Sequence, residues 1–277
     1  MNKKYYFIVI LIAISIIVYI SLNGMKKQSN CLSIFSWDST EVTMSEIDVM
    51  KKYLKELNVN IIYQNIDGFT NEEIEKFVKE LKDNDISIYS LAGEPSWYEE
   101  DGKVIKYIER INDYNKSVKN KYRIEGIVLD IEPWIVNKEW DRTVYSKTME
   151  KVYKYSQELN IKLVTVIPTW FDPSDLEIII KNCDKVAVMN YNIDFPTENI
   201  KEEIYIAKKF NKSIDIIAEI QPINEEYGVE ENTTYYYEGH DVLLNDWNKI
   251  KEVYKYNKIG FCYHDYENIK EFINLEE

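Results

Sequence analysis

Two carboxylates stand two residues apart at the end of one apolar run. Residues 125–134 read EGIVLDIEPW, which places Asp130 and Glu132 just before a proline and a tryptophan. Side chains alternate along a strand, so Val128, Asp130 and Glu132 share one face. Two neighbouring carboxyls in a half-dry site do not both ionise easily, so one pKa rises. The pair therefore predicts an acid that protonates a leaving oxygen near neutral pH. An ion pair with a lysine or arginine is the structural alternative.

Tryptophans follow four separate apolar runs, namely Trp37, Trp97, Trp134 and Trp170. An indole ring is an apolar plate with a polar edge, which suits stacking against the C–H faces of sugar rings. Each one alone could simply pack a loop. Four together favour a carbohydrate-binding cleft.

The elements that must position these residues are eight short apolar runs that alternate with helical patterns. Thr70 with Glu73 forms a predicted capping box, and Asp172-Pro173 predicts a second helix start. Eight such units predict an α/β fold, a (β/α)8 TIM barrel over residues 32–277, with its active site at the C-terminal strand ends. An open doubly wound sheet is the alternative, but the chain lacks its glycine-rich first turn. The runs cover residues 32–37, 60–66, 86–91, 124–131, 162–167, 185–191, 214–220 and 259–263.

Residues 1–31 differ from the rest of the chain. They hold an apolar run, residues 5–22, that is about long enough to span a bilayer as one helix. No small-residue cleavage site follows it, which favours an uncleaved signal anchor over a cleaved signal peptide. We therefore expect an extracytoplasmic barrel anchored to the cell membrane, or a secreted one if the segment is removed.

Charge and composition limit the possible partners. The net charge is −14, and the first 31 residues carry four lysines and no acidic residue, so the remainder carries −18. Such a domain repels nucleic acid and fits a neutral or cationic ligand. Three scattered cysteines and two histidines give no metal-ligand pattern. The sequence thus predicts a monomer with no metal and no cofactor.

The run at 125–134 resembles the D-G-x-D-x-D-x-E signature of family 18 glycoside hydrolases, the chitinase-like barrels. Residues 90–93 (SLAG) resemble that family's S-x-G-G, and residues 189–192 (MNYN) resemble its M-x-Y-D. The resemblance implies retaining hydrolysis assisted by the substrate's own N-acetyl group, an exception to the usual carboxylate pair. It implies Glu132 as proton donor, Asp130 as the residue that orients the N-acetyl group, and Tyr191 as a hydrogen-bond partner of the acetamido oxygen.

The resemblance has three departures and one further position of interest. Glu125 and Val128 replace the first two aspartates of the signature, and Asn192 replaces the last aspartate of M-x-Y-D. A buried valine cannot share a proton with Asp130. Tyr263 stands where the family often carries a tryptophan, and the adjacent His264 is either a ligand contact or a structural histidine.

Two alternatives to the substrate-assisted mechanism remain. Glu219 lies near the end of the seventh run, followed by Gln221 as a candidate substrate contact. Many barrel glycosidases place an acid/base glutamate after the fourth strand and a nucleophile after the seventh, which would pair Glu132 with Glu219 on another polysaccharide. The other alternative is a carbohydrate-binding cell-envelope protein without turnover. The favoured hypothesis is a hydrolase of N-acetylglucosamine-containing glycans, of chitin or peptidoglycan type.

Overall fold

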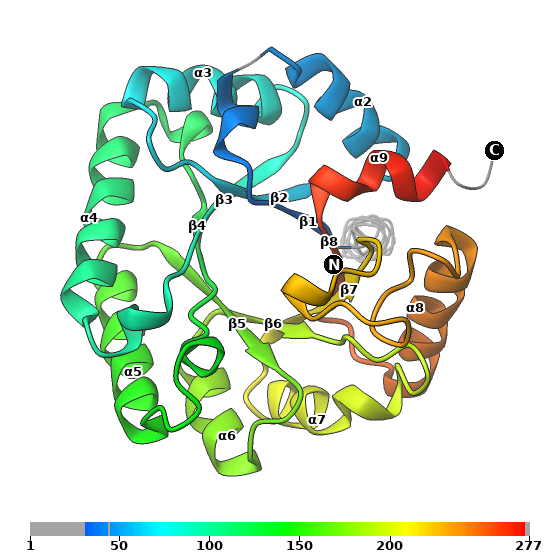
Figure 1. Ribbon diagram of the computed structural model, residues 1–277. Helices are drawn as coiled ribbons and strands as arrows, with labels where there is room; N and C mark the ends of the chain where they lie inside the picture. Colours follow the sequence, from blue (N-terminus) through cyan, green and yellow to red (C-terminus); the bar gives the residue numbers. More distant parts are fainter. Residues whose placement is uncertain (1–30, 44, 275–277) are drawn as a thin grey trace, which may run out of the picture. The chain divides into compact units, whose positions relative to one another are not determined.

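The computed structural model describes residues 31–43 and 45–274. Within them, eight parallel strands close into a barrel in chain order, as Figure 1 shows from one end of the barrel. This confirms the predicted (β/α)8 architecture. The strands are β1 (Leu32–Ser36), β2 (Ile61–Asn65), β3 (Ser87–Ala92), β4 (Gly126–Leu129), β5 (Lys162–Pro168), β6 (Lys185–Met189), β7 (Ser213–Glu219) and β8 (Ile259–His264).

One α-helix follows each strand and lies on the outside of the barrel (Figure 1). Thr70 and Glu73 form the predicted capping box at the start of α3, and α6 begins at Pro173 as expected. The helices are α2 (Ile47–Glu56), α3 (Asn71–Lys82), α4 (Asp101–Ser117), α5 (Arg142–Glu158), α6 (Pro173–Lys181), α7 (Lys201–Lys209), α8 (His240–Tyr254) and α9 (Tyr266–Asn274).

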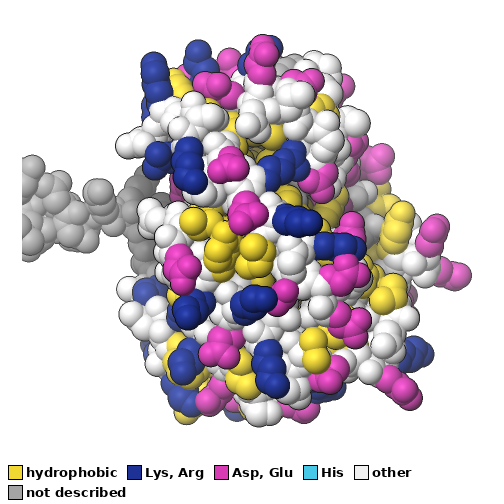
Figure 2. Space-filling model, turned by 90° about the vertical axis from the view of Figure 1, so that its left-hand side faces the viewer, with side chains coloured by type: hydrophobic (Ala, Val, Ile, Leu, Met, Phe, Trp, Pro, Cys, Tyr) yellow, Lys and Arg dark blue, Asp and Glu magenta, His cyan; other side chains and the backbone are white. Residues whose placement is uncertain are grey.

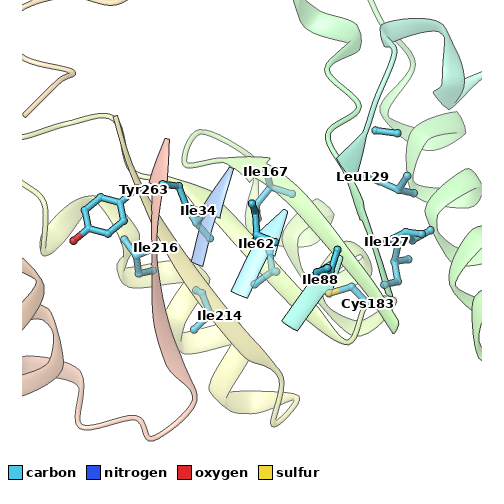
Figure 3. Packing of buried hydrophobic residues seen from close by; sticks show 14 of the residues in the cluster. Ile34, Ile62, Ile88, Ile127, Leu129, Ile167, Cys183, Ile214, Ile216 and Tyr263 are labelled. Carbon is cyan, nitrogen blue, oxygen red and sulfur yellow. The ribbon is translucent and has the colours of Figure 1, made fainter. Parts of the chain in front are cut away.

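Alternate residues of each strand belong to two separate apolar layers. The outer layer joins the strands to the helices, and Figure 3 shows part of it, including Ile127 and Leu129 of β4. The inner layer fills the barrel and includes Phe35, Leu91 and Val128. Because the side-chain period of a strand is two residues, the residues that continue the inner set past each strand end point into the barrel mouth.

A buried polar cluster fills the N-terminal end of the barrel. The Asp215 carboxylate accepts hydrogen bonds from Lys185 at 3.0 Å, Ser33 at 2.9 Å and Tyr63 at 2.5 Å. Near the same end Glu125 accepts hydrogen bonds from Lys82 at 2.7 Å and Ser87 at 2.6 Å. Burial opposes its ionisation, but these partners leave the pKa of Glu125 below its usual range. Glu125 is thus a structural ion-pair residue, far along the strand from the mouth.

The outer surface carries both signs of charge. Figure 2 shows the side of the barrel around α4, where basic and acidic side chains are interspersed. No helix in residues 31–43 or 45–274 is long and apolar enough to cross a membrane. The predicted N-terminal anchor lies outside the described residues and stays a prediction, as do its cleavage and the location of the protein. The described residues group as one compact unit by their internal contacts.

Candidate active site

A cavity of about 1110 Å³ opens at the C-terminal ends of the strands. Seven carboxyl side chains line it, and among the described residues no lysine or arginine does. The lining residues are Trp37, Asp38, Asp130, Glu132, Trp134, Ile135, Pro168, Thr169, Trp170, Met189, Tyr191, Glu219, Gln221, Glu226, Tyr227, His264, Asp265, Glu267 and Asn268. Size and position fit the usual ligand site of this fold.

The β4 carboxylates point into this cavity, as the alternation predicted. Val128 belongs to the inner layer, and Ile131 belongs to the outer one. The Asp130 amide donates to the Ala92 carbonyl at 3.0 Å, which extends the β3–β4 pairing by one residue. A β-carbon at Gly93 would lie 1.8 Å from the Asp130 carbonyl oxygen. Only glycine at position 93 therefore lets β3 and β4 close around Asp130.

Burial raises the pKa of both carboxyls above the usual values. Desolvation, then the charge of Glu132, raises the pKa of Asp130 to about 8, while His264 opposes the rise. Desolvation also raises the pKa of Glu132, against the charge of His264 and a hydrogen bond from Trp134. Because the two groups titrate together, the pair retains one shared proton near neutral pH. The Oδ1 atom of Asp130 is buried and has no hydrogen-bond partner among the described residues, while the residue as a whole lines the cavity.

Glu219 lies in the same cavity but is firmly bound. It is 2% exposed. Its Oε1 atom accepts the amides of Ile220 and Gln221, each at 3.0 Å, and its Oε2 atom lies 3.0 Å from Nδ1 of His264. Burial opposes ionisation, but His264 and these donors lower the pKa of Glu219. Burial disfavours the imidazolium, yet Glu219 raises the pKa of His264 to about 9. The two form a buried ion pair near neutral pH.

Tyr191 lies two residues beyond β6 and faces the carboxyls. Its ring lies 6.1 Å from the His264 ring, measured between centroids. Burial, followed by the charges of Glu219, Asp130 and Glu132, raises its pKa well above the usual value. Tyr191 therefore stays protonated and is available as a hydrogen-bond donor in the cavity.

Three of the four predicted tryptophans line the cavity. Trp37 extends β1 and packs on Phe35, and Trp170 is 49% exposed at the rim. Trp134 is supported from behind by Trp140 and Phe171, with ring centroids at 5.6 and 5.4 Å.

Trp97 and Tyr263, predicted as substrate contacts, lie elsewhere. Trp97 is buried in the outer layer, 5.8 Å from the Tyr107 ring of α4. Tyr263 also joins the outer layer (Figure 3), where it packs on Trp247 and bonds His240 at 2.8 Å. On β8 the inward positions are Cys262 and His264, so the residue between them must face the helices. Both placements correct the prediction.

The remaining predicted positions divide in two. Gln221 lines the cavity beside Glu219. Asn192 does not line it, and its side chain instead accepts the Phe195 amide at 3.1 Å, which shapes the loop after β6. The sequence prediction missed four acidic residues of the cavity, namely Asp38, Glu226, Asp265 and Glu267. Asp38 directly follows the predicted end of the first run at residue 37, and Asp265 lies two residues beyond the predicted end of the eighth run at residue 263, so position along the chain was an available signal.

Among the described residues, no group of three or more histidine, cysteine, aspartate or glutamate side chains could hold a metal ion.

Comparison with known proteins identifies the fold relatives. No protein-family model matches the sequence, and no curated protein does. Among solved structures, the barrel is similar to a GH18 chitinase from Pseudoalteromonas aurantia. The TM-score is 0.54 at 10% identity, over 87% of this chain and 97% of that chain.

Two further structures give a similar match. The spore cortex-lytic enzyme SleL of Bacillus megaterium QM B1551 has a TM-score of 0.54 at 9% identity, over 88% of this chain and 74% of that chain. A family 17 beta-1,3-glucanosyltransferase from Rhizomucor miehei has a TM-score of 0.52 at 15% identity, over 89% and 92%. The (β/α)8 barrel of this protein is similar in fold to these three structures. At these identities the likeness concerns the fold, and any activity must be argued from the site.

Proposed function

We propose that this protein hydrolyses glycans that contain N-acetylglucosamine, with Glu132 as the proton donor and the substrate's own acetamido group as the nucleophile. The observation that carries the proposal is the β4 pair, in which two coupled carboxyls with raised pKa values face one cavity. A carboxylic acid that stays protonated near neutral pH is what the departure of an alcohol requires.

The proposed reaction has two steps. Glu132 protonates the glycosidic oxygen while the acetamido oxygen attacks the anomeric carbon and the bond to the leaving sugar breaks. Asp130, which lines the cavity, accepts a hydrogen bond from the acetamido N–H through its carboxylate, and its charge stabilises the cation that forms. The Glu132 carboxylate then takes a proton from water, which opens the ring intermediate with net retention.

Tyr191 has a defined part in this scheme. Its protonated hydroxyl donates a hydrogen bond to the acetamido oxygen and so aims that oxygen at the anomeric carbon.

Glu219 is a less suitable nucleophile than the acetamido group. A nucleophilic carboxylate must present a lone pair to the anomeric carbon, whereas both oxygens of Glu219 already accept hydrogen bonds. Its lowered pKa still keeps it ionised inside the cavity, so the two-glutamate mechanism is the second candidate. A slow substrate separates the two, because only a nucleophilic Glu219 yields a trapped glycosyl adduct in the native chain, and Glu219→Gln would then abolish that adduct.

The cavity also limits the class of glycan. Aromatic side chains at Trp134 and Trp170 supply stacking surfaces on the β4 and β5 side. Even with one proton on the Asp130–Glu132 pair and the His264 imidazolium beside Glu219, the acidic lining of the described cavity leaves a negative field, which favours neutral or amino sugars over polyanionic chains. Chitin-type chains and the glycan strands of peptidoglycan meet this requirement.

The test is direct. Residues 31–277 are incubated with N-acetylglucosamine oligomers or with peptidoglycan, and new reducing ends are measured. We expect release by the native barrel and its loss in Glu132→Gln. Tight oligomer binding without any release in the native barrel would instead indicate a non-catalytic carbohydrate-binding protein.

A further inference from the structure

His264 occupies a half-buried position among the acidic groups of the site. Its ring lies 5.5 Å from that of Phe35 and 6.1 Å from that of Tyr191, between centroids. Its Nδ1 atom is bound by Glu219 at 3.0 Å. In the pairing of β7 with β8, His264 is the direct partner of Glu219. The pairing of β7 with β8 thus holds the imidazole beside the Glu219 carboxylate.

We infer that His264 is a positioning residue: bound by Glu219, its imidazolium supplies the charge that keeps one of the two β4 carboxyls ionised, in place of the carboxyl that is missing at Val128. This inference rests on the proposed role of Asp130 and Glu132. It gives a role to Glu219 and His264, which take no direct part in the proposed hydrolytic steps.

The charges around His264 are nearly all negative. Glu219 on β7, Asp130 and Glu132 on β4, and Asp265 beside it are the ionisable groups that act on it or are acted on by it. Tyr191, after β6, faces it as a neutral phenol, and β1 contributes only the Phe35 ring. The sole cation among these groups is therefore the imidazolium.

Removal of the imidazolium is expected to raise the pKa of the Asp130–Glu132 pair. His264, Asp130 and Glu132 line the same cavity, and a nearby opposite charge favours the ionised form of a carboxyl. Without His264 the Asp130–Glu132 pair holds its second proton to a higher pH. A doubly protonated pair cannot stabilise the cationic intermediate, so activity at low pH falls.

The test uses the pH profile of kcat/KM for the full chain. We expect His264→Gln to move both limbs of the profile to higher pH by about one unit, with a loss on the order of ten-fold on the acid side that shrinks on the alkaline side. The matched control is His240→Gln, because His240 bonds Tyr263 outside the cavity. It should leave both limbs in place. A His264→Gln profile that is lowered evenly, with unmoved limbs, would mean a merely structural role and overturn the inference.

A second measurement does not depend on turnover. The chain has two histidines, so His240→Gln leaves only His264 to be followed by NMR as the pH changes. We expect its imidazole to titrate at a pKa of about 9, and Glu219→Gln to lower that pKa by at least one unit. Titration of His264 below pH 7 in the Glu219-containing chain refutes the inference even if the protein is an active hydrolase. Absence of hydrolysis with a titration near pH 9 refutes the proposed function alone.

Discussion

Replacement of Glu132 by glutamine tests the active site at its centre. Glutamine keeps the length and shape of the side chain, and its amide oxygen can still accept the hydrogen bond from Trp134. It cannot release a proton. A positioned general acid typically contributes about 10²–10⁴ in rate, which corresponds to about 3–5 kcal/mol of transition-state stabilisation. We therefore expect kcat for glycan hydrolysis to fall by this factor while the Kd for oligomers changes little.

The same substitution, which lowers activity, is expected to raise the stability of the fold at alkaline pH. The folded-state pKa of Glu132 is raised above its unfolded value because burial disfavours the carboxylate. The folded protein therefore binds more protons than the unfolded chain, and this group costs stability as the pH rises through that interval. Glu132→Gln should melt at a higher temperature than the native chain at pH 8, with the difference vanishing near pH 4.

Two assays decide the matter. Reducing ends are counted with saturating N-acetylglucosamine oligomer, and oligomer binding is measured by calorimetry on the same preparations. Full activity in Glu132→Gln would refute the assignment of the proton donor. A large loss of binding together with activity would show that Glu132 acts through ground-state contacts instead.

Four further outcomes follow from the structure. Glu219→Gln should lose activity only modestly, and the native chain should show no covalent adduct with a slow substrate by mass spectrometry; a trapped adduct in the native chain would favour the two-glutamate mechanism. Trp134→Ala should weaken oligomer binding more than stability, whereas Trp97→Ala, in the outer layer, should cost roughly 3–5 kcal/mol by denaturant unfolding and spare binding. Gly93→Ala should displace Asp130 and lower kcat, visible as lost activity in a chain with native circular dichroism. Residues 32–277 should fold without residues 1–31, and an aggregated product would contradict this.

The barrel was predictable because its signals are local. Each strand is a short apolar run and each helix has its own cap or stripe, as at Thr70 and Asp172. The inward direction of Asp130 and Glu132 was predictable for the same reason, since a strand's period is two residues regardless of its surroundings. The end of the strand was less certain: the run 124–131 was expected, and the observed β4 is Gly126–Leu129.

Trp97 and Tyr263, the two aromatic residues predicted to line the cavity that do not, show that local sequence patterns do not always give the direction of a side chain. Trp97 follows β3 by five residues and lies in a short 3-10 helix, Pro95–Tyr98, whose turn directs it toward α4. Distance along the chain from a strand end does not give that direction. Tyr263 is different, because the alternation applied to β4 would have excluded it on β8. Tyr263 and His264 are adjacent on one strand, so they could not both enter the cavity.

The Glu219–His264 pair required knowledge that no single strand contains. Each residue ends its own strand, and their contact depends on the register between β7 and β8. That register follows from closure of the whole barrel. The Glu219–His264 pair changes the interpretation of Val128. The sequence alone indicated only that a valine at this position cannot share a proton with Asp130. In the folded protein, the carboxyl is missing from β4, and the imidazolium of His264 on β8 opposes the rise in the pKa of both Asp130 and Glu132 from a different strand. The departures from the family 18 signature must therefore be judged across the whole barrel mouth, because the acidity of Glu132 depends on every charge in it.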